Sequence, residues 1–413
     1  MTVVNIDSTT QPRLVVFSSL FPSPVQPNAG LFIRERMFRV AQWIPLVVVA
    51  PQPWFPFQSL IRWFRPHFRP MAPRYEIQQG IEVYHPRFLC FPGIFKRTDG
   101  LLMALSCWPL MWKLRRRLGY RLIDAHFGYP DGYAATLLGC WLRVPVAVTL
   151  RGKEARQSEM ALRGLLAAAV QRADLVIAVS CALRDLAVSL GANPARTQVI
   201  GNGVDLARFR PVPQAEARRL LGLPEAAKVL ISVGGLVEGK GFHRIIARLP
   251  ALMRRFPDLH YLVVGGGTPA GDLSAELCQQ ALELGLEHRV HFMGAIPPDR
   301  LSMLYSAADV FVLATRYEGW ANVFLEAMAC GLPVVSTQVG GNAQVVTSER
   351  VGLLVPFDDP EALETALIRG LDHPWDRAAI RAYAEANGWE NRMNTLVPAL
   401  TALIEQQAVL EET

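Results

Sequence analysis

The sequence of 413 residues lacks several features that would assign it to familiar classes of protein. Its six cysteines form no Cys-x-x-Cys pair and are accompanied by no paired histidines, which argues against a zinc site or a disulfide framework. We expect them to be reduced core residues. The longest apolar run, residues 101–112, is well short of the ~20 residues that cross a bilayer, and the first ten residues do not resemble a secretory signal. We therefore expect a cytoplasmic protein.

Metal-binding and nucleic-acid-binding motifs are also missing. No Asp-x-Asp, no His-Glu-x-x-His and no carboxylate cluster with metal-ligand spacing occurs, so we predict no metal site. No helix-turn-helix, zinc-finger or RNA-recognition signature occurs either, so we predict no nucleic-acid partner.

Charge is distributed unevenly along the chain. The formal net charge is +6, but residues 1–203 carry 24 Lys and Arg against 11 Asp and Glu, whereas residues 204–413 carry 18 against 25. Within the basic half, residues 62–69 and 113–117 mix cations with large apolar side chains, as contacts with an anionic membrane surface do. The same residues equally fit an ordinary solvated surface, and the sequence leaves both interpretations open.

Short β-branched runs alternate throughout with stretches of helical periodicity, which predict helices at residues 30–42, 100–118, 130–142, 155–172, 181–190 and 241–256, among others. This alternation predicts an α/β protein with doubly wound parallel sheets. The rhythm restarts after residues 201–205 and a Pro-bearing stretch at 209–213, where the charge balance also reverses. We therefore predict two domains that meet near residue 203, and we expect residues 51–75, rich in Pro and aromatics, to form a long irregular insertion.

The most informative stretch is residues 316–335, which directly follows a predicted strand. Glu318 would lie in the strand-to-helix loop, and Glu326 would lie in the helix that begins near Trp320, so that both face one ligand. The free amides at the start of a helix suit a phosphate, whereas carboxylates suit the hydroxyl groups of a ribose and a sugar. This combination indicates a nucleotide sugar.

Glu318 and Glu326, followed by Ala-Met-Ala-Cys-Gly-Leu-Pro-Val-Val at 327–335, resemble the signature of the large retaining GT-B glycosyltransferase family, the family 4 or group 1 type. That family includes sucrose and bacterial polysaccharide synthases. The resemblance implies that Glu326 binds the donor ribose and that Glu318 contacts the transferred sugar. It assigns sugar and pyrophosphate binding to the backbone amides of Gly319, Trp320, Ala321, Asn322 and Val323.

Residues 233–241 resemble the phosphate-binding loop of the second domain in this family. Gly234 and Gly235 would then approach the donor, and Lys240 would neutralise the departing pyrophosphate. The family commonly has an arginine at the position of Gly235, so this chain has one cation fewer there. The candidates to replace that cation are Arg151, Lys153 and Arg316.

Three segments of the first half also match the family in order. Residues 124–132 resemble the segment whose histidine approaches the transferred sugar, which makes His126 a catalytic candidate together with Glu318 and Lys240. Arg151 lies in a second matching loop, in which Glu154 stands where the family often has Asp. Gly30, between a predicted strand and helix, would admit close approach of the pyrophosphate or the acceptor.

The resemblance covers nearly the whole chain and implies a GT-B fold, in which two Rossmann-like domains face a central cleft. It implies an acceptor-side domain at 1–203, a nucleotide-sugar-binding domain at 204–386, and a helix at 387–413 that returns to the first domain. The implied function is retaining, metal-independent transfer of a hexose-type sugar, without a cofactor, from a UDP- or GDP-linked donor to a hydroxyl of a glycan or lipid-linked acceptor. This would serve cell-surface polysaccharide or glycolipid synthesis at the inner face of the plasma membrane.

Two alternatives remain open from the sequence. A nucleotide-sugar 2-epimerase has the same architecture, but it needs additional acid and base carboxylates and no acceptor. A non-catalytic, membrane-associated homologue that binds nucleotide sugars would explain the departure at Gly235, although both glutamates, Lys240 and His126 are retained. A dehydrogenase is disfavoured because neither half contains a full Gly-x-Gly-x-x-Gly turn with an acidic residue ~20 positions further on.

Overall fold

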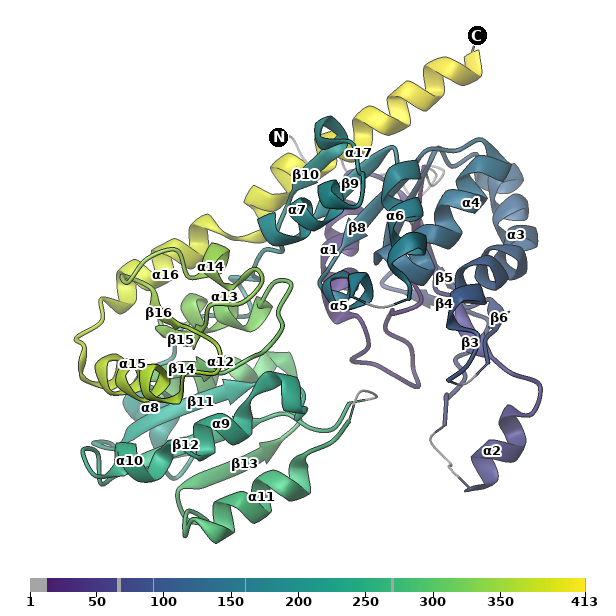
Figure 1. Cartoon of the computed structure of the whole chain (residues 1–413). Coiled ribbons are helices and arrows are strands. Elements are labelled where there is room, and N and C mark those ends of the chain that lie inside the picture. The colour runs from purple at the N-terminus through teal and green to yellow at the C-terminus, as the bar shows by residue number, and fades with distance from the viewer. Residues whose placement is uncertain (1–12, 65–67, 92, 160, 269–270, 413) are drawn as a thin grey trace. The chain divides into compact units, whose positions relative to one another are not determined.

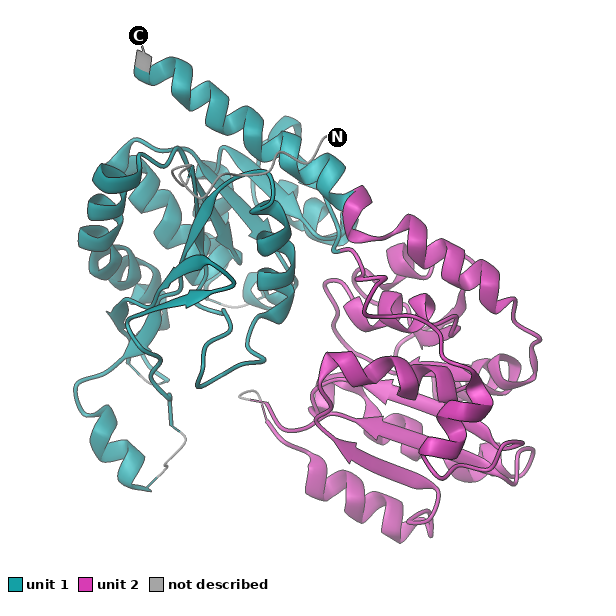
Figure 2. Cartoon of the chain, turned by 180° about the vertical axis from the view of Figure 1, so that it is seen from behind, with its two compact units in different colours: residues 1–202, 392–413 teal, residues 203–391 magenta. Residues whose placement is uncertain are grey.

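The chain forms two compact units in a computed structural model that describes residues 13–64, 68–91, 93–159, 161–268 and 271–412. Unit 1 comprises the residues up to 202 together with those from 392 onward, and unit 2 comprises residues 203–391 (Figure 1, Figure 2). Each unit has its own mostly parallel sheet connected by helices, so the predicted α/β class is confirmed.

Unit 1 is built on an eight-stranded sheet in the order β10-β9-β8-β7-β1-β2-β5-β4. All neighbouring strands are parallel except the antiparallel edge pair β4 and β5. Every residue of β1, β2, β7, β8 and β9 is buried, as expected for parallel strands that are covered on both faces. The strands are β1 Leu14–Phe17, β2 Leu46–Val49, β4 Tyr75–Gln78, β5 Ile81–Tyr84, β7 Leu122–His126, β8 Val146–Leu150, β9 Leu175–Ala178 and β10 Thr197–Val199.

The helices of unit 1 lie at the predicted segments, but the helix expected at 155–172 is divided into two, α5 and α6. The helices are α1 Leu31–Val40, α2 Gln58–Phe64, α3 Asp99–Leu118, α4 Tyr133–Leu142, α5 Lys153–Ser158, α6 Arg163–Arg172 and α7 Cys181–Ser189, with the short helices η1 Lys96–Thr98, η2 Gly128–Gly132 and η3 Pro194–Arg196. The expected irregular insertion at 51–75 instead contains α2 and a short strand, β3 Gln52–Trp54, which pairs with β6 Arg87–Leu89. Residues 65–67 of that insertion lie outside the described residues.

Unit 2 contains a six-stranded, entirely parallel sheet in the order β13-β12-β11-β14-β15-β16. Its strands are β11 Lys228–Val233, β12 Leu259–Val264, β13 Val290–Gly294, β14 Val310–Leu313, β15 Val334–Thr337 and β16 Gly352–Val355. Its helices are α8 Gln214–Leu220, η4 Glu238–Lys240, α9 Phe242–Ile246, α10 Leu249–Met253, α11 Ser274–Glu283, α12 Pro298–Ala307, α13 Asn322–Ala329, α14 Asn342–Val345, α15 Pro360–Asp372 and α16 Arg377–Ala386. The single helix expected near 241–256 is thus divided into α9 and α10.

The last helix, α17 Trp389–Glu412, ends in unit 1. The Glu411 carboxylate accepts hydrogen bonds from Arg121 at 3.0 Å and from Arg115, and the Gln407 amide donates to the Arg143 carbonyl at 3.0 Å. The predicted return of the C-terminal helix to the first domain is therefore confirmed.

The structure bears on two expectations from the sequence, one about the cysteines and one about membrane-spanning helices. Cys90, Cys107 and Cys330 are buried, but Cys140 and Cys278 are exposed, so the expectation that all cysteines lie in the core was wrong. None of the helices in the described part of the chain combines the length and the apolar character that crossing a bilayer requires.

Candidate active site

Unit 2 brings Lys240 and Glu318 together at the carboxyl edge of its sheet. Lys240 follows β11 and Glu318 follows β14, and these strands are neighbours. The Lys240 Nζ donates to Glu318 Oε2 at 2.6 Å. The side chains are 29% and 13% exposed, so the pair is partly shielded from water. The two charges are therefore held next to each other where open α/β sheets bind ligands.

Two glycines allow the loops around this pair to pack tightly. Gly241 has a φ of +77°, and a Cβ there would lie 2.0 Å from the carbonyl oxygen of Ala314. Gly340 has a φ of +50°, and a Cβ there would lie 1.8 Å from the carbonyl oxygen of Glu318, which also accepts a hydrogen bond from the Gly341 amide at 3.1 Å. A side chain at either glycine would push apart the loops that position the pair.

Glu326 projects from α13 and is oriented by a buried tyrosine of α12. The Tyr305 hydroxyl donates to Glu326 Oε2 at 3.1 Å. Burial, together with the charge of Glu326, raises the pKa of Tyr305 well above its ordinary value, so the phenol stays protonated and remains a donor. Residues 319–321 lead into α13, and the first amides of any helix lack intrahelical acceptors. The free amides at the start of α13 and the Glu326 carboxylate further along thus belong to the same helix.

The loop after β11 explains the glycine at position 235. A Cβ on Gly235 would lie 2.4 Å from Thr268 Cγ2, and a Cβ on Gly265 would lie 1.8 Å from the Gly234 carbonyl oxygen. An arginine at position 235 therefore has no room unless Thr268 moves. The absence of an arginine at position 235 is thus accompanied by close packing between the loops after β11 and β12.

In unit 1, His126 lies at the end of β7 and is fully buried. Its Nδ1 accepts hydrogen bonds from Arg151 Nε at 3.2 Å and from Arg151 Nη2 at 3.0 Å. An Nδ1 that accepts leaves the ring proton on Nε2, which faces Asp124 Oδ2 at 3.6 Å. Burial, reinforced by the charges of Arg151 and Arg36, lowers the pKa of His126 well below its ordinary value. His126 is therefore a neutral Nε2–H donor, and it is unsuited to act as a general acid.

A second buried arginine completes this network. Arg36, from α1, donates to the Ile200 carbonyl at 3.0 Å, and Arg151 Nη1 donates to Asn202 Oδ1 at 3.2 Å. Burial lowers the pKa of Arg36 to about 10, so it remains protonated at neutral pH. Burial raises the pKa of Asp124 to about 6, although Arg36 and Arg151 oppose that rise. The cluster therefore has two buried cations beside one titratable carboxylate.

The neighbouring loops of unit 1 are tied down by two buried carboxylates. Glu154 accepts from the amides of Gly128, Arg151 and Gly152 at 3.0, 3.1 and 2.7 Å. Asp131 accepts from the Ser19 hydroxyl at 3.0 Å and from the Ser19 amide, and burial raises the pKa of Asp131 to about 6. These bonds join the loops after β1, β7 and β8 at one edge of the sheet.

Gly30 has a structural role in the same unit. It precedes α1 with a φ of +69°, and a Cβ there would lie 2.3 Å from the Leu20 carbonyl oxygen. The backbone of Gly30 thus lies close to that of Leu20, and the approach of pyrophosphate or acceptor to Gly30 stays a prediction.

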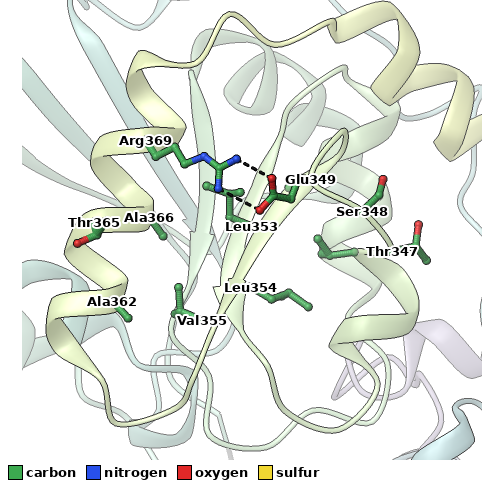
Figure 3. A pocket seen from close by; sticks show the side chains of 12 residues that line it. Thr347, Ser348, Glu349, Leu353, Leu354, Val355, Ala362, Thr365, Ala366 and Arg369 are labelled. Atoms are coloured by element: carbon green, nitrogen blue, oxygen red, sulfur yellow. Dashed lines mark hydrogen bonds and ion pairs between the residues drawn. The ribbon is translucent and has the colours of Figure 1, made fainter.

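One hollow of unit 2, of about 460 Å³, lies between β16 and α15. Glu349 and Arg369 line it and form two parallel hydrogen bonds of 3.0 and 2.6 Å (Figure 3). Because these two charges neutralise each other, the hollow offers no free cation to a phosphate. In the described part of the chain, no group of three or more His, Cys, Asp and Glu residues could hold a metal ion.

Comparisons with known proteins decide the family. Residues 213–387 match the family described as Glycosyl transferases group 1, and residues 18–208 match Glycosyltransferase Family 4. A D-inositol 3-phosphate glycosyltransferase of Corynebacterium urealyticum is 35% identical over 351 residues, which cover 79% of this chain and 82% of the relative. The chain belongs to the group 1 glycosyltransferases.

Two further proteins extend this result. The protein of Bacillus subtilis named for teichuronic acid biosynthesis, TuaC, is 28% identical over 366 residues, 86% of this glycosyltransferase and 88% of TuaC. The structure of Anabaena HepE in complex with UDP aligns with a TM-score of 0.70 at 21% identity, and it covers 94% of this chain and 100% of HepE. This group 1 glycosyltransferase accordingly has the GT-B fold.

The structure groups the predicted site residues of this glycosyltransferase into two sets. Lys240 and Glu318 are in contact in unit 2, where Glu326 and Gly319, Trp320, Ala321, Asn322 and Val323 occupy α13 and the loop before it. His126 and Arg151 are in contact in unit 1. Four residues of these sets were not predicted from the sequence. Asn202 accepts from Arg151 and Tyr305 donates to Glu326, while Arg36 and Asp124 belong to the same buried cluster as His126. The motif at 201–205 was noted only as a boundary, although it supplies Asn202.

Proposed function

We propose that this glycosyltransferase transfers a hexose from a UDP- or GDP-linked donor to a hydroxyl of a glycan or lipid-linked acceptor, with retention at the anomeric carbon and without a metal. The observation that carries the proposal is the arrangement in unit 2. The Lys240–Glu318 pair and the Tyr305-oriented Glu326 flank the helix start at α13, so a cation, two carboxylates and backbone amides occur together. These groups match a diphosphate, a hexose and a ribose.

In the proposed reaction, the bond between the anomeric carbon and the diphosphate oxygen breaks while a bond to the acceptor oxygen forms on the same face. The acceptor proton passes to the departing phosphate oxygen, so no protein base is required. Lys240 and the amides before α13 stabilise the leaving diphosphate, and Glu318 orients the sugar hydroxyls. Catalysis of this kind consists of positioning and electrostatic stabilisation.

The relatives support the donor and acceptor classes. HepE was crystallised with UDP and with UDP-glucose, which makes UDP-glucose a first donor to test. The names of the two relatives refer to D-inositol 3-phosphate and to teichuronic acid biosynthesis, and an inositol ring carries several hydroxyls.

The stereochemical part can be tested without knowing the acceptor. Slow hydrolysis of a UDP-α-hexose by the enzyme should release the α-anomer first, as followed by proton NMR before mutarotation. Initial release of the β-anomer would contradict retention. An isomeric nucleotide sugar formed without an acceptor would instead establish the 2-epimerase, and nucleotide binding without any turnover would favour the non-catalytic homologue.

A further inference from the structure

Large apolar side chains that remain exposed gather on unit 1. Of 21 such side chains among the described residues, 17 belong to unit 1 and four to unit 2. Four of the 17 are tryptophans: Trp63, Trp108, Trp112 and Trp141. Single exposed apolar residues need no explanation, but a concentration of this kind on one unit indicates a contact surface.

Helix α3 carries the most regular part of this surface. Leu101, Leu105, Trp108 and Trp112 are all exposed, and their spacing of four, three and four residues places them on one side of the helix. The opposite side packs into unit 1 through Met103, Ala104, Cys107, Met111 and Leu114. A helix at a protein–water boundary normally has a polar outer side, whereas the exposed side of α3 carries this apolar stripe beside polar residues such as Ser106 and Lys113.

Contacts between phenylalanines join this stripe to α2. Phe57 contacts Phe55, Phe55 contacts Phe91, and Phe91 contacts Phe95, with ring centroids 5.7, 5.7 and 5.9 Å apart. Phe57 and Phe95, at the two ends of this series, are 66% and 64% exposed. Helix α2 adds the exposed side chains of Leu60, Trp63 and Phe64. Figure 1 shows α2, β3, β6 and α3 along the same side of unit 1.

We call the exposed residues of α3, of the phenylalanine series and of α2 the aromatic face. Cations border it. The Arg116 guanidinium lies over the Trp112 ring at 4.8 Å from its centroid, and Lys113, next to Trp112 on α3, is exposed. Arg117 is instead paired with Glu82. Residues 1–203 as a whole carry a formal charge of +13. A second copy of this chain would meet the aromatic face with the same positive charge, which disfavours self-association.

We propose that the aromatic face docks on the surface of an anionic lipid bilayer. Tryptophans and leucines enter the boundary between headgroups and acyl chains, while neighbouring lysines and arginines contact lipid phosphates. This docking is separate from the proposed sugar transfer, because it requires no donor. It would hold unit 1, the acceptor-side unit, at a membrane that carries lipid-linked acceptors, and that consequence rests on the proposed function.

Flotation with lipid vesicles tests the docking. One set of vesicles contains phosphatidylcholine alone, and the other contains about 30% phosphatidylglycerol. The wild-type chain should float with the anionic vesicles, and the bound fraction should fall as salt is raised. The triple variant Leu105→Ser/Trp108→Ser/Trp112→Ser should bind the anionic vesicles about tenfold more weakly than wild type. The matched control, Leu220→Ser/Leu282→Ser/Leu284→Ser, removes three exposed leucines from unit 2 and should float like wild type.

The proposal is overturned if the wild-type chain fails to float with anionic vesicles, if the face variant floats as well as wild type, or if the control loses as much binding as the face variant. Release of nucleotide from the donor, assayed without vesicles, separates this outcome from the proposed function. A wild-type chain that turns over donor but does not float refutes only the docking. A chain that floats but turns over no donor refutes only the proposed function.

Discussion

The Lys240 ammonium and the Glu318 carboxylate form a 2.6 Å ion pair, although 78 positions separate them in the sequence. In the proposed function, Lys240 faces the diphosphate and Glu318 faces the sugar. Without a donor each neutralises the other, so neither charge is left isolated in this partly buried place. A donor that reaches this pair finds both groups already positioned.

Disruption of this pair should give non-additive losses. Lys240→Ala should lower kcat by about 10²- to 10³-fold, because a cation aimed at the leaving group is lost and Glu318 is left to repel the diphosphate. Glu318→Gln in the Lys240→Ala background should cost less than it does in the wild type, since there it also removes the repulsion between the uncompensated carboxylate and the diphosphate. Steady-state donor turnover by the two single variants and the double variant measures this coupling. If the fold-loss of the double variant equals the product of the two single losses, the pair does not act as a unit.

The contact between Arg151 and His126 predicts the shape of the pH profile. In the wild type, His126 stays neutral because its pKa is lowered by burial and by Arg151. The rate of donor turnover should therefore show no change caused by histidine protonation between about pH 6 and 8. In Arg151→Ala the pKa of His126 should rise toward its ordinary value, and protonation should introduce a new fall in turnover below about pH 6.5. The exposed Arg163→Ala should keep the wild-type profile. An unchanged profile in Arg151→Ala would contradict this role.

Tyr305 should affect donor binding more than the chemical step. Tyr305→Phe removes the hydrogen bond that orients Glu326, and we expect the donor KM to rise about fivefold with a smaller change in kcat. Tyr261→Phe is a matched control, because that buried hydroxyl donates to Ser232 Oγ at 2.7 Å within the core of unit 2. A KM that rises equally in both variants would point to general loosening of unit 2 instead of an effect on Glu326.

Asp131 should make stability depend on pH. Burial raises its pKa to about 6, above the 3.8 of an unperturbed Asp, so protonation favours the folded state most at low pH. This contribution is complete below about pH 4 and is lost as the pH rises through about 6. In Asp131→Asn the side chain is an amide, which does not ionise, so no stability is lost as the pH rises. The variant should therefore gain stability relative to wild type between pH 4.5 and 7, by about 3 kcal/mol at most. Thermal unfolding of both proteins across this range measures the difference, and a constant difference in Tm would contradict the buried-carboxyl account.

The sequence was sufficient where the function depends on residues within one motif. Alternating strand and helix patterns predicted both α/β halves, and the spacing of Glu318 and Glu326 predicted a loop followed by a helix. The Lys240–Glu318 contact required knowledge that β11 and β14 are neighbours, which the family resemblance supplied only as roles for each residue.

The sequence was insufficient where distant elements meet. The cluster around His126 takes its groups from α1, β7, the loop after β8 and the loop after β10, and no local pattern marks Arg36 or Asn202 as partners. The contact between Gly235 and Thr268 likewise depends on two loops packing together. For α3, periodicity predicted a helix, but only the packed structure shows that two tryptophans face outward.

Donor turnover in EDTA tests the central claim most directly. UDP-, GDP- and ADP-sugars would be screened for nucleotide release by the wild type, by Glu326→Ala, and by Glu349→Ala, a glutamate of unit 2 paired with Arg369. We predict that wild type and Glu349→Ala release one nucleotide in EDTA and that Glu326→Ala does not. Release that requires added metal, or that persists at the wild-type rate in Glu326→Ala, would contradict the assignment of this site to a metal-independent transferase.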